Sequence, residues 1–117
     1  MVNSGSKRLW NALHYSLAGF AAAYKNEAAF RQELLLALVL IPAAMFLPVS
    51  ATGKTLMIAS VLLVLVVELL NSAIEAVVDR ISLENHELAK RAKDIGSAAV
   101  MLSLVNLAVV WLLIIFF

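Results

Sequence analysis

Three long runs of apolar residues dominate the chain and predict three membrane-spanning helices, at residues 32–49, 55–78 and 95–117. A helix needs roughly 20 apolar residues to cross about 30 Å of hydrocarbon. The last run carries no charged residue, whereas the second is long enough but contains Glu68 and Glu75. The first run is short, so its helix can span the membrane only if flanking residues on both sides are included in the span.

The segment before these runs has a different pattern, in which apolar residues recur at steps of three and four. These residues are Trp10, Leu13, Leu17, Phe20 and Tyr24. The spacing predicts an amphipathic helix at residues 7–31 that lies on the membrane surface, after a tail at residues 1–6. A secretory signal peptide is the alternative, but Asn11, His14 and Ser16 would make its apolar core too polar.

Composition narrows the class of protein. Of the 117 residues, 63% are hydrophobic and only 15% are charged, which argues against an ordinary soluble domain. The net charge of +1 does not provide a basic face for nucleic acid, so no nucleic-acid partner is expected. Because the chain has no cysteine, disulfides, thiolate metal sites and cysteine nucleophiles are excluded. The sequence therefore predicts a small all-α membrane protein.

The distribution of basic residues predicts the orientation in the membrane. Four precede the first span and four lie between the second and third: Lys7, Arg8, Lys25, Arg31, Arg80, Lys90, Arg91 and Lys93. Segments rich in lysine and arginine stay in the cytoplasm. We therefore expect a cytoplasmic N-terminus, a cytoplasmic segment 79–94 and a C-terminus on the outside.

The second run carries polar residues that a simple membrane anchor does not need. Glu68, Asn71, Glu75 and Asp79 are spaced so that they share one face of a helix. Placing a charged carboxylate inside the membrane costs at least about 2.5–3.5 kcal/mol. A single such residue could be an interhelical hydrogen-bond partner, but four aligned groups favour a functional site.

Two further charged clusters flank the spans. Glu27, Arg31 and Glu33 precede the first span, and residues 84–99 mix acidic, basic and histidine side chains. Either cluster alone is typical of a solvated membrane surface. The predicted topology brings all three clusters to one membrane face, where carboxylates for a divalent cation and cations for phosphate groups would meet.

Three motifs resemble those of the small integral-membrane diacylglycerol kinases of bacteria. They are NEAAFRQE at 26–33, VELLNSAIEAVVDR at 67–80 and HELAKRAKDIGSAAV at 86–100. The resemblance implies an enzyme that uses ATP and Mg²⁺ to convert diacylglycerol to phosphatidic acid at the cytoplasmic face of the bacterial inner membrane. It also implies a homotrimer with active sites formed between subunits, each with a surface helix and three membrane helices.

The resemblance also implies roles for individual residues. Glu68 would be the general base for the lipid hydroxyl, and Glu27 and Glu75 would bind the metal ion. The ATP contacts would be Arg8, Tyr15, Glu27, Glu75, Glu84, His86, Lys93 and Asp94. The lipid site would be lined by Arg31, Glu33, Glu68, Ser97 and Trp111, while Asn71 and Asp79 would support the catalytic face.

Other functions remain open at this point. Related kinases act on undecaprenol, although the Asn71–Ser72 pair is more similar to the diacylglycerol branch. A small proton-coupled transporter would explain Glu68, but it would leave Glu27, Lys93 and Asp94 without a role. A non-enzymatic assembly partner would explain an oligomer but not the aligned acids.

Overall fold

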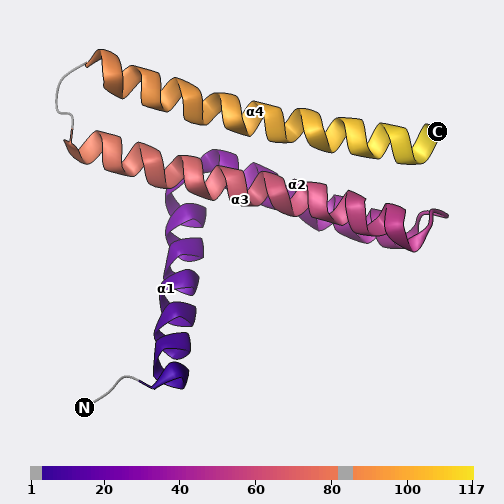
Figure 1. Cartoon of the computed structure of the whole chain (residues 1–117), viewed down its shortest axis with the longest axis horizontal. Helices are drawn as coiled ribbons and strands as arrows, with labels where there is room; N and C mark the ends of the chain where they lie inside the picture. The colour runs from indigo at the N-terminus through magenta and orange to yellow at the C-terminus, as the bar shows by residue number, and fades with distance from the viewer. Residues whose placement is uncertain (1–3, 82–85) are drawn as a thin grey trace.

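The computed structural model describes residues 4–81 and 86–117, and in these residues every regular element is a helix. The helices are α1 (Gly5–Asn26), α2 (Ala28–Phe46), α3 (Ala51–Ile81) and α4 (Glu87–Phe116). Helices α2, α3 and α4 run alongside one another, and α1 runs crosswise to them (Figure 1). By length and composition, α2, α3 and α4 can each cross a membrane. The prediction of an all-α chain with three membrane spans is confirmed.

The helix ends differ from the predicted boundaries. The surface helix predicted at 7–31 ends at Asn26, because Glu27 is extended, with φ −118° and ψ 107°, and the next residues already belong to α2. Helix α2 ends at Phe46, since a residue that precedes a proline, here Leu47, disfavours the helical conformation. Helices α3 and α4 extend beyond the runs 55–78 and 95–117 because polar residues at their ends continue the same helix.

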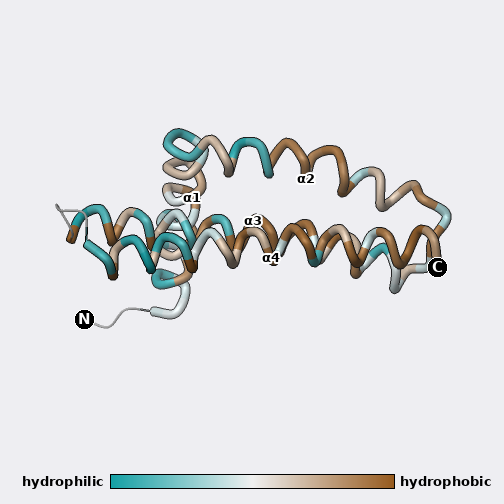
Figure 2. The backbone as a smooth tube through the Cα atoms, turned by 90° about the horizontal axis from the view of Figure 1, so that it is seen from above, coloured by the Kyte–Doolittle hydropathy of each residue, from teal (hydrophilic) through white to brown (hydrophobic). Residues whose placement is uncertain are grey.

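The core lies where α3 contacts α2 and α4. Its buried residues are Ala37, Ala44, Met57, Val61 and Trp111. Small side chains on α2 let the two backbones approach closely, as is common where helices pack in membranes. Figure 2 shows that the hydrophobic residues fill the ends of α2, α3 and α4 on the side of the C-terminus, whereas hydrophilic residues gather at the opposite end.

A lysine closes the turn between α2 and α3. The Lys54 ammonium donates hydrogen bonds to the carbonyl oxygens of Ala44, Met45 and Leu47, at 3.3, 2.9 and 2.6 Å. The last carbonyls of a helix have no partner within it, so an external donor is needed when they leave water. Lys54 therefore holds the end of α2 against the first turn of α3.

Helix α1 has most of its surface exposed. Ala23 is its only residue classed as buried, and the large apolar side chains of Leu9, Trp10, Leu13 and Leu17 are exposed. The N-terminus of α1 is capped by Ser4, whose hydroxyl accepts from the Lys7 N–H at 3.2 Å. The contact of α1 with the rest of the chain is thus confined to its C-terminal part.

Candidate functional site

A groove of about 710 Å³ lies between the C-terminal half of α1 and the C-terminal half of α3. This volume is within the range of small-molecule sites in proteins. Its acidic lining consists of Glu27, Glu75 and Asp79, and we call it the acidic groove. Small residues of both helices leave the space open: Ser16, Gly19, Ala22, Ala23, Ser72, Ala73 and Ala76.

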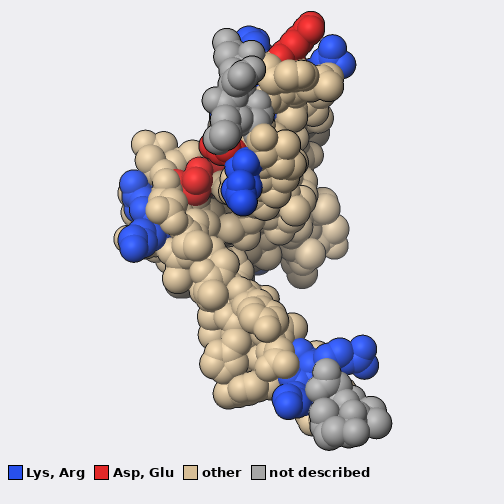
Figure 3. All heavy atoms as spheres, turned by 90° about the vertical axis from the view of Figure 1, so that its left-hand side faces the viewer, with Lys and Arg blue, Asp and Glu red and all other residues tan. Residues whose placement is uncertain are grey.

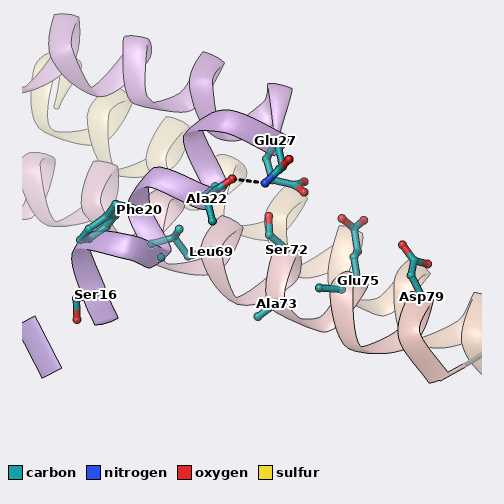
Figure 4. A pocket seen from close by; sticks show the side chains of 13 residues that line it. Ser16, Phe20, Ala22, Glu27, Leu69, Ser72, Ala73, Glu75 and Asp79 are labelled. Atoms are coloured by element: carbon teal, nitrogen blue, oxygen red, sulfur yellow. Dashed lines mark hydrogen bonds between the residues drawn. The ribbon is translucent and has the colours of Figure 1, made fainter. Parts of the chain in front are cut away.

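The helical spacing of α3 places its polar residues toward this groove. Ser72, Glu75 and Asp79 project from the same side of α3, and Glu27 lies on that side (Figure 4). Glu27 is the single residue between α1 and α2, so its position is set by the angle between those helices. The Glu27 and Glu75 carboxylates are close enough to repel each other. Residues 48 positions apart in sequence thus form one acidic pair.

Glu68 lies on α3 one turn before Ser72 and about two turns before Glu75, and it is buried, with 3% of its surface exposed. The Ser72 hydroxyl donates a hydrogen bond of 3.5 Å to Glu68 Oε2, and Ser72 also lines the acidic groove. On the other side, the Glu33 side chain of α2 contacts Glu68. Carboxyl groups are costly inside a membrane helix pair, so their juxtaposition here favours a functional site.

Asn71 fixes the distance between α3 and α4 at the level of Glu68. It is 8% exposed, and within the part of the chain that the structure describes its Oδ1 atom has no hydrogen-bond partner. A Cβ atom at Gly96 would collide with that oxygen, so the close approach of α4 requires glycine. The contact brings the neighbouring Ser97 of α4 to the same level.

Two lysines of α4 form ion pairs, and the partner of Lys93 is Asp79, which lines the acidic groove. The Lys93 Nζ atom lies 2.6 Å from Asp79 Oδ1, and Lys90 Nζ lies 2.6 Å from Asp94 Oδ2. Lys93 lies before the uncharged segment 95–117. The hydrogen bond with Asp79 and the negative charge of the Asp79 carboxylate raise the pKa of the Lys93 ammonium. Figure 3 shows acidic and basic side chains close together at this end of the molecule. The site therefore combines carboxylates with a cation suited to phosphate.

The acidic pair offers carboxylate oxygens, which are donors of the kind that Mg²⁺ takes. Mg²⁺ usually takes one or two carboxylates and completes its shell with water and phosphate oxygens. Within residues 4–81 and 86–117, no three acidic or histidine side chains form a complete metal site. Glu27 and Glu75 supply hard oxygen donors in the number that such a shared ion needs.

Comparison with known proteins decides the family. The family model for prokaryotic diacylglycerol kinases matches residues 14–115. A diacylglycerol kinase of Pseudomonas aeruginosa is 60% identical over 108 residues, which are 92% of this chain and 88% of the relative. The diacylglycerol kinase of Haemophilus influenzae is 53% identical over 114 residues, which are 97% of this chain and 97% of the relative. That of Escherichia coli K12 is 51% identical over 108 residues, which are 92% of this chain and 88% of the relative.

The chain belongs to the prokaryotic diacylglycerol kinase family. The resemblance carried by the three motifs is thereby confirmed, and the chain is an enzyme of the kinase class rather than a transporter or an assembly partner. All three motifs fall within the matched residues. The acidic groove is lined by Asn26 and Glu27 of the first motif and by residues of the second motif, among them Ser72, Glu75 and Asp79.

Several residues that family resemblance would assign to the site lie apart from the acidic groove within one chain. Arg8 and Tyr15 line a separate shallow pocket toward the free end of α1, and Arg8 is about 28 Å from Glu27 along the helix axis. Trp111 lies in the core beside Met57, about 16 Å along α3 from Glu68. The Nδ1 atom of His86 accepts from the Leu88 N–H at 3.0 Å and caps α4. The prediction for Glu84 lies outside the described residues.

Sequence reasoning missed two contacts that shape this site. One is the hydrogen bond from Ser72 to Glu68; the position of Ser72 one turn after Glu68 is a signal for a side-chain contact on a helix. The Glu33–Glu68 contact joins two helices. It could not be found from spacing because it depends on how α2 packs against α3.

Proposed function

We propose that this chain transfers the γ-phosphoryl group of ATP to the hydroxyl of diacylglycerol, giving phosphatidic acid at the cytoplasmic face of the bacterial inner membrane. The observation that carries the proposal is the acidic groove, which Glu27 and Glu75 both line, with Glu75 about two helical turns along α3 from Glu68. Family membership supports it, since relatives at 51–60% identity carry the name diacylglycerol kinase. The basic residues near the N-terminus and at 80–93 support the cytoplasmic placement of this end.

In the proposed reaction, Glu68 acts on the lipid hydroxyl. The hydroxyl oxygen forms a bond with the γ-phosphorus, the bond from that phosphorus to the β–γ bridging oxygen breaks, and ADP leaves. The hydroxyl proton moves to the Glu68 carboxylate, which Ser72 orients. Phosphoryl transfer depends mainly on the positions of the reacting groups and on charge neutralisation. A base with a fixed orientation therefore serves to place the lipid hydroxyl in line with the γ-phosphorus and to take its proton.

Glu27 and Glu75 would hold Mg²⁺ on the phosphates of ATP. When bound, this ion neutralises charge on the transferred group. Asp79 and Lys93 form an ion pair beside this position, from which the Lys93 ammonium can turn to a phosphate oxygen. Asp94 and His86 lie at the same end of α4, where we place the rest of the nucleotide, together with Glu84.

We also propose a homotrimer in which neighbouring subunits complete each site. Arg8 lies about 28 Å along α1 from Glu27, and the exposed side chains of Arg8 and Tyr15 line a separate pocket, so α1 would deliver them to a neighbour. The wide apolar exposure of α1 supports a position on the membrane surface against lipid and a second subunit. On the lipid side we place Glu33 and Ser97, which flank Glu68 and Asn71.

The test is a lipid phosphorylation assay with the purified protein in bilayer vesicles. With γ-labelled ATP and Mg²⁺, we expect label in phosphatidic acid only when diacylglycerol is present. Undecaprenol in place of diacylglycerol tests the other substrate branch of the family. Label in undecaprenol alone would overturn the proposed substrate, and ATP hydrolysis that is independent of any lipid would overturn the proposed reaction.

A further inference from the structure

The α1–α2 junction is held by one side chain. The Arg31 guanidinium donates through a single nitrogen to the carbonyl oxygens of Tyr24, at 2.6 Å, and Lys25, at 3.2 Å. Both carbonyls belong to the last turn of α1, and Arg31 itself lies in the first turn of α2. A cation is favourable at the C-terminal end of a helix because the unpaired carbonyls there carry partial negative charge.

The only residue between these two helices is Glu27. Its side chain makes no hydrogen bond to the N-terminus of α2, so local capping does not fix its direction. The bonds from Arg31 span the junction from one side to the other and restrict the angle between the helices. That angle decides whether the Glu27 carboxylate faces Glu75 across the acidic groove.

We propose that Arg31 is a positioning residue that acts through Glu27, clasping α1 to α2 so that the metal-binding pair stays formed. This role differs from the lipid contact that family resemblance implies for Arg31. The proposal rests on the proposed kinase function for its kinetic consequence. Its structural consequence, a fixed angle between α1 and α2, is independent of that function.

Kinetics separate the two roles of Arg31. With Arg31→Gln we expect KM for MgATP and the Mg²⁺ concentration for half-maximal rate to rise about tenfold, since a misplacement of about 1 Å can cost up to 100-fold in rate. KM for diacylglycerol should stay within about twofold of the parent. Arg31→Lys keeps the charge and one donor group, so it should recover part of the loss. A rise in KM for diacylglycerol alone would overturn the proposal.

A distance measurement tests the clasp directly. The chain has no cysteine, so spin labels can be placed at Leu9→Cys on α1 and Leu38→Cys on α2, where both side chains are exposed. Labelled chains are diluted with unlabelled ones so that each distance is within one chain. We expect a broader or shifted distance distribution in Arg31→Gln than in the labelled parent.

Lys25→Gln is the matched control, because it removes a positive charge from the last turn of α1 but leaves the two hydrogen bonds of the Arg31 side chain in place. It should give the distance distribution of the labelled parent. An unchanged distribution in both Arg31→Gln and Arg31→Lys would overturn the clasp. A parent protein without lipid kinase activity would overturn the proposed function instead, and the distance measurement would still decide the role of Arg31.

Discussion

The indole N–H of Trp111 donates to the carbonyl oxygen of Met57 at 3.1 Å and joins α4 to α3 across 54 positions of sequence. The same N–H lies 3.2 Å from the Ser60 hydroxyl oxygen, and that hydroxyl donates to the Met57 carbonyl at 2.7 Å. All three residues are buried. Trp111 therefore has a packing and hydrogen-bonding role between two membrane helices.

Trp111→Phe is expected to lower the free energy of unfolding by about 1–2 kcal/mol, because it removes the hydrogen-bond donor and part of a buried ring. Unfolding can be followed in mixed micelles by titration with a denaturing detergent. A selective rise in KM for diacylglycerol with unchanged unfolding would contradict the packing role and assign Trp111 to the lipid site.

Glu68→Gln is expected to lower kcat by about 100- to 10,000-fold, because the amide cannot accept the proton of the lipid hydroxyl. The substitution is close to isosteric, so KM for MgATP should change little. The measurement is the initial rate of label transfer from ATP to diacylglycerol under saturating conditions.

The matched control for this prediction is Glu87→Gln, since Glu87 is an exposed glutamate in the first turn of α4. It should keep kcat near that of the parent. If Glu68→Gln turns over at the rate of Glu87→Gln, Glu68 is not the base.

Glu27→Gln and Glu75→Gln are each expected to raise the Mg²⁺ concentration needed for half-maximal rate. The reason is that each removes one of the two carboxylates proposed to share the ion. In the double variant, the loss of Mg²⁺ binding free energy should be smaller than the sum of the losses in the two single variants, because residues that bind one ligand are coupled. A magnesium titration of initial rates measures this. Metal dependence equal to that of the parent in both single variants would refute the assignment.

Gly96→Ala is expected to lower stability by about 1–3 kcal/mol, because the added Cβ forces the buried Asn71 amide to move. Activity should fall with it, since Asn71 lies one turn from Glu68. Gly19→Ala is the control for the stability measurement alone: a Cβ there has no atom within 4 Å, although the residue lines the acidic groove, and alanine is a better helix former. Equal unfolding free energies of the two variants would contradict the close contact between Gly96 and Asn71.

Much of the fold was predictable because the bilayer demands long apolar helices. The runs around Leu62 and Val109 leave little choice other than membrane helices, and the shared face of Glu68, Asn71 and Glu75 follows from helical geometry alone. The break at Glu27 was not predicted. The residues on either side of it favour helix, and the two bonds from Arg31 that stabilise the break cross it from α2.

The candidate site was predictable in its residue types but not in its partners. The spacing of the acidic residues on α3 predicts a polar face of that helix. The contact of Glu33 with Glu68 cannot be predicted in this way, because it depends on the packing of α2 against α3. Gly96 was quoted only as part of a motif, because a missing side chain leaves no chemical signal until its neighbour, Asn71, is known.

The three bonds from Lys54 also bear on the thickness of the membrane that suits this chain. Helix α2 has 19 residues and so is about 28 Å long, close to the hydrocarbon thickness of a typical bilayer. Because the ammonium already has three carbonyl partners, it can lie at the hydrocarbon boundary without a full shell of water. A bilayer with longer acyl chains would be thicker than α2 is long, so we expect such a bilayer to thin locally around this helix.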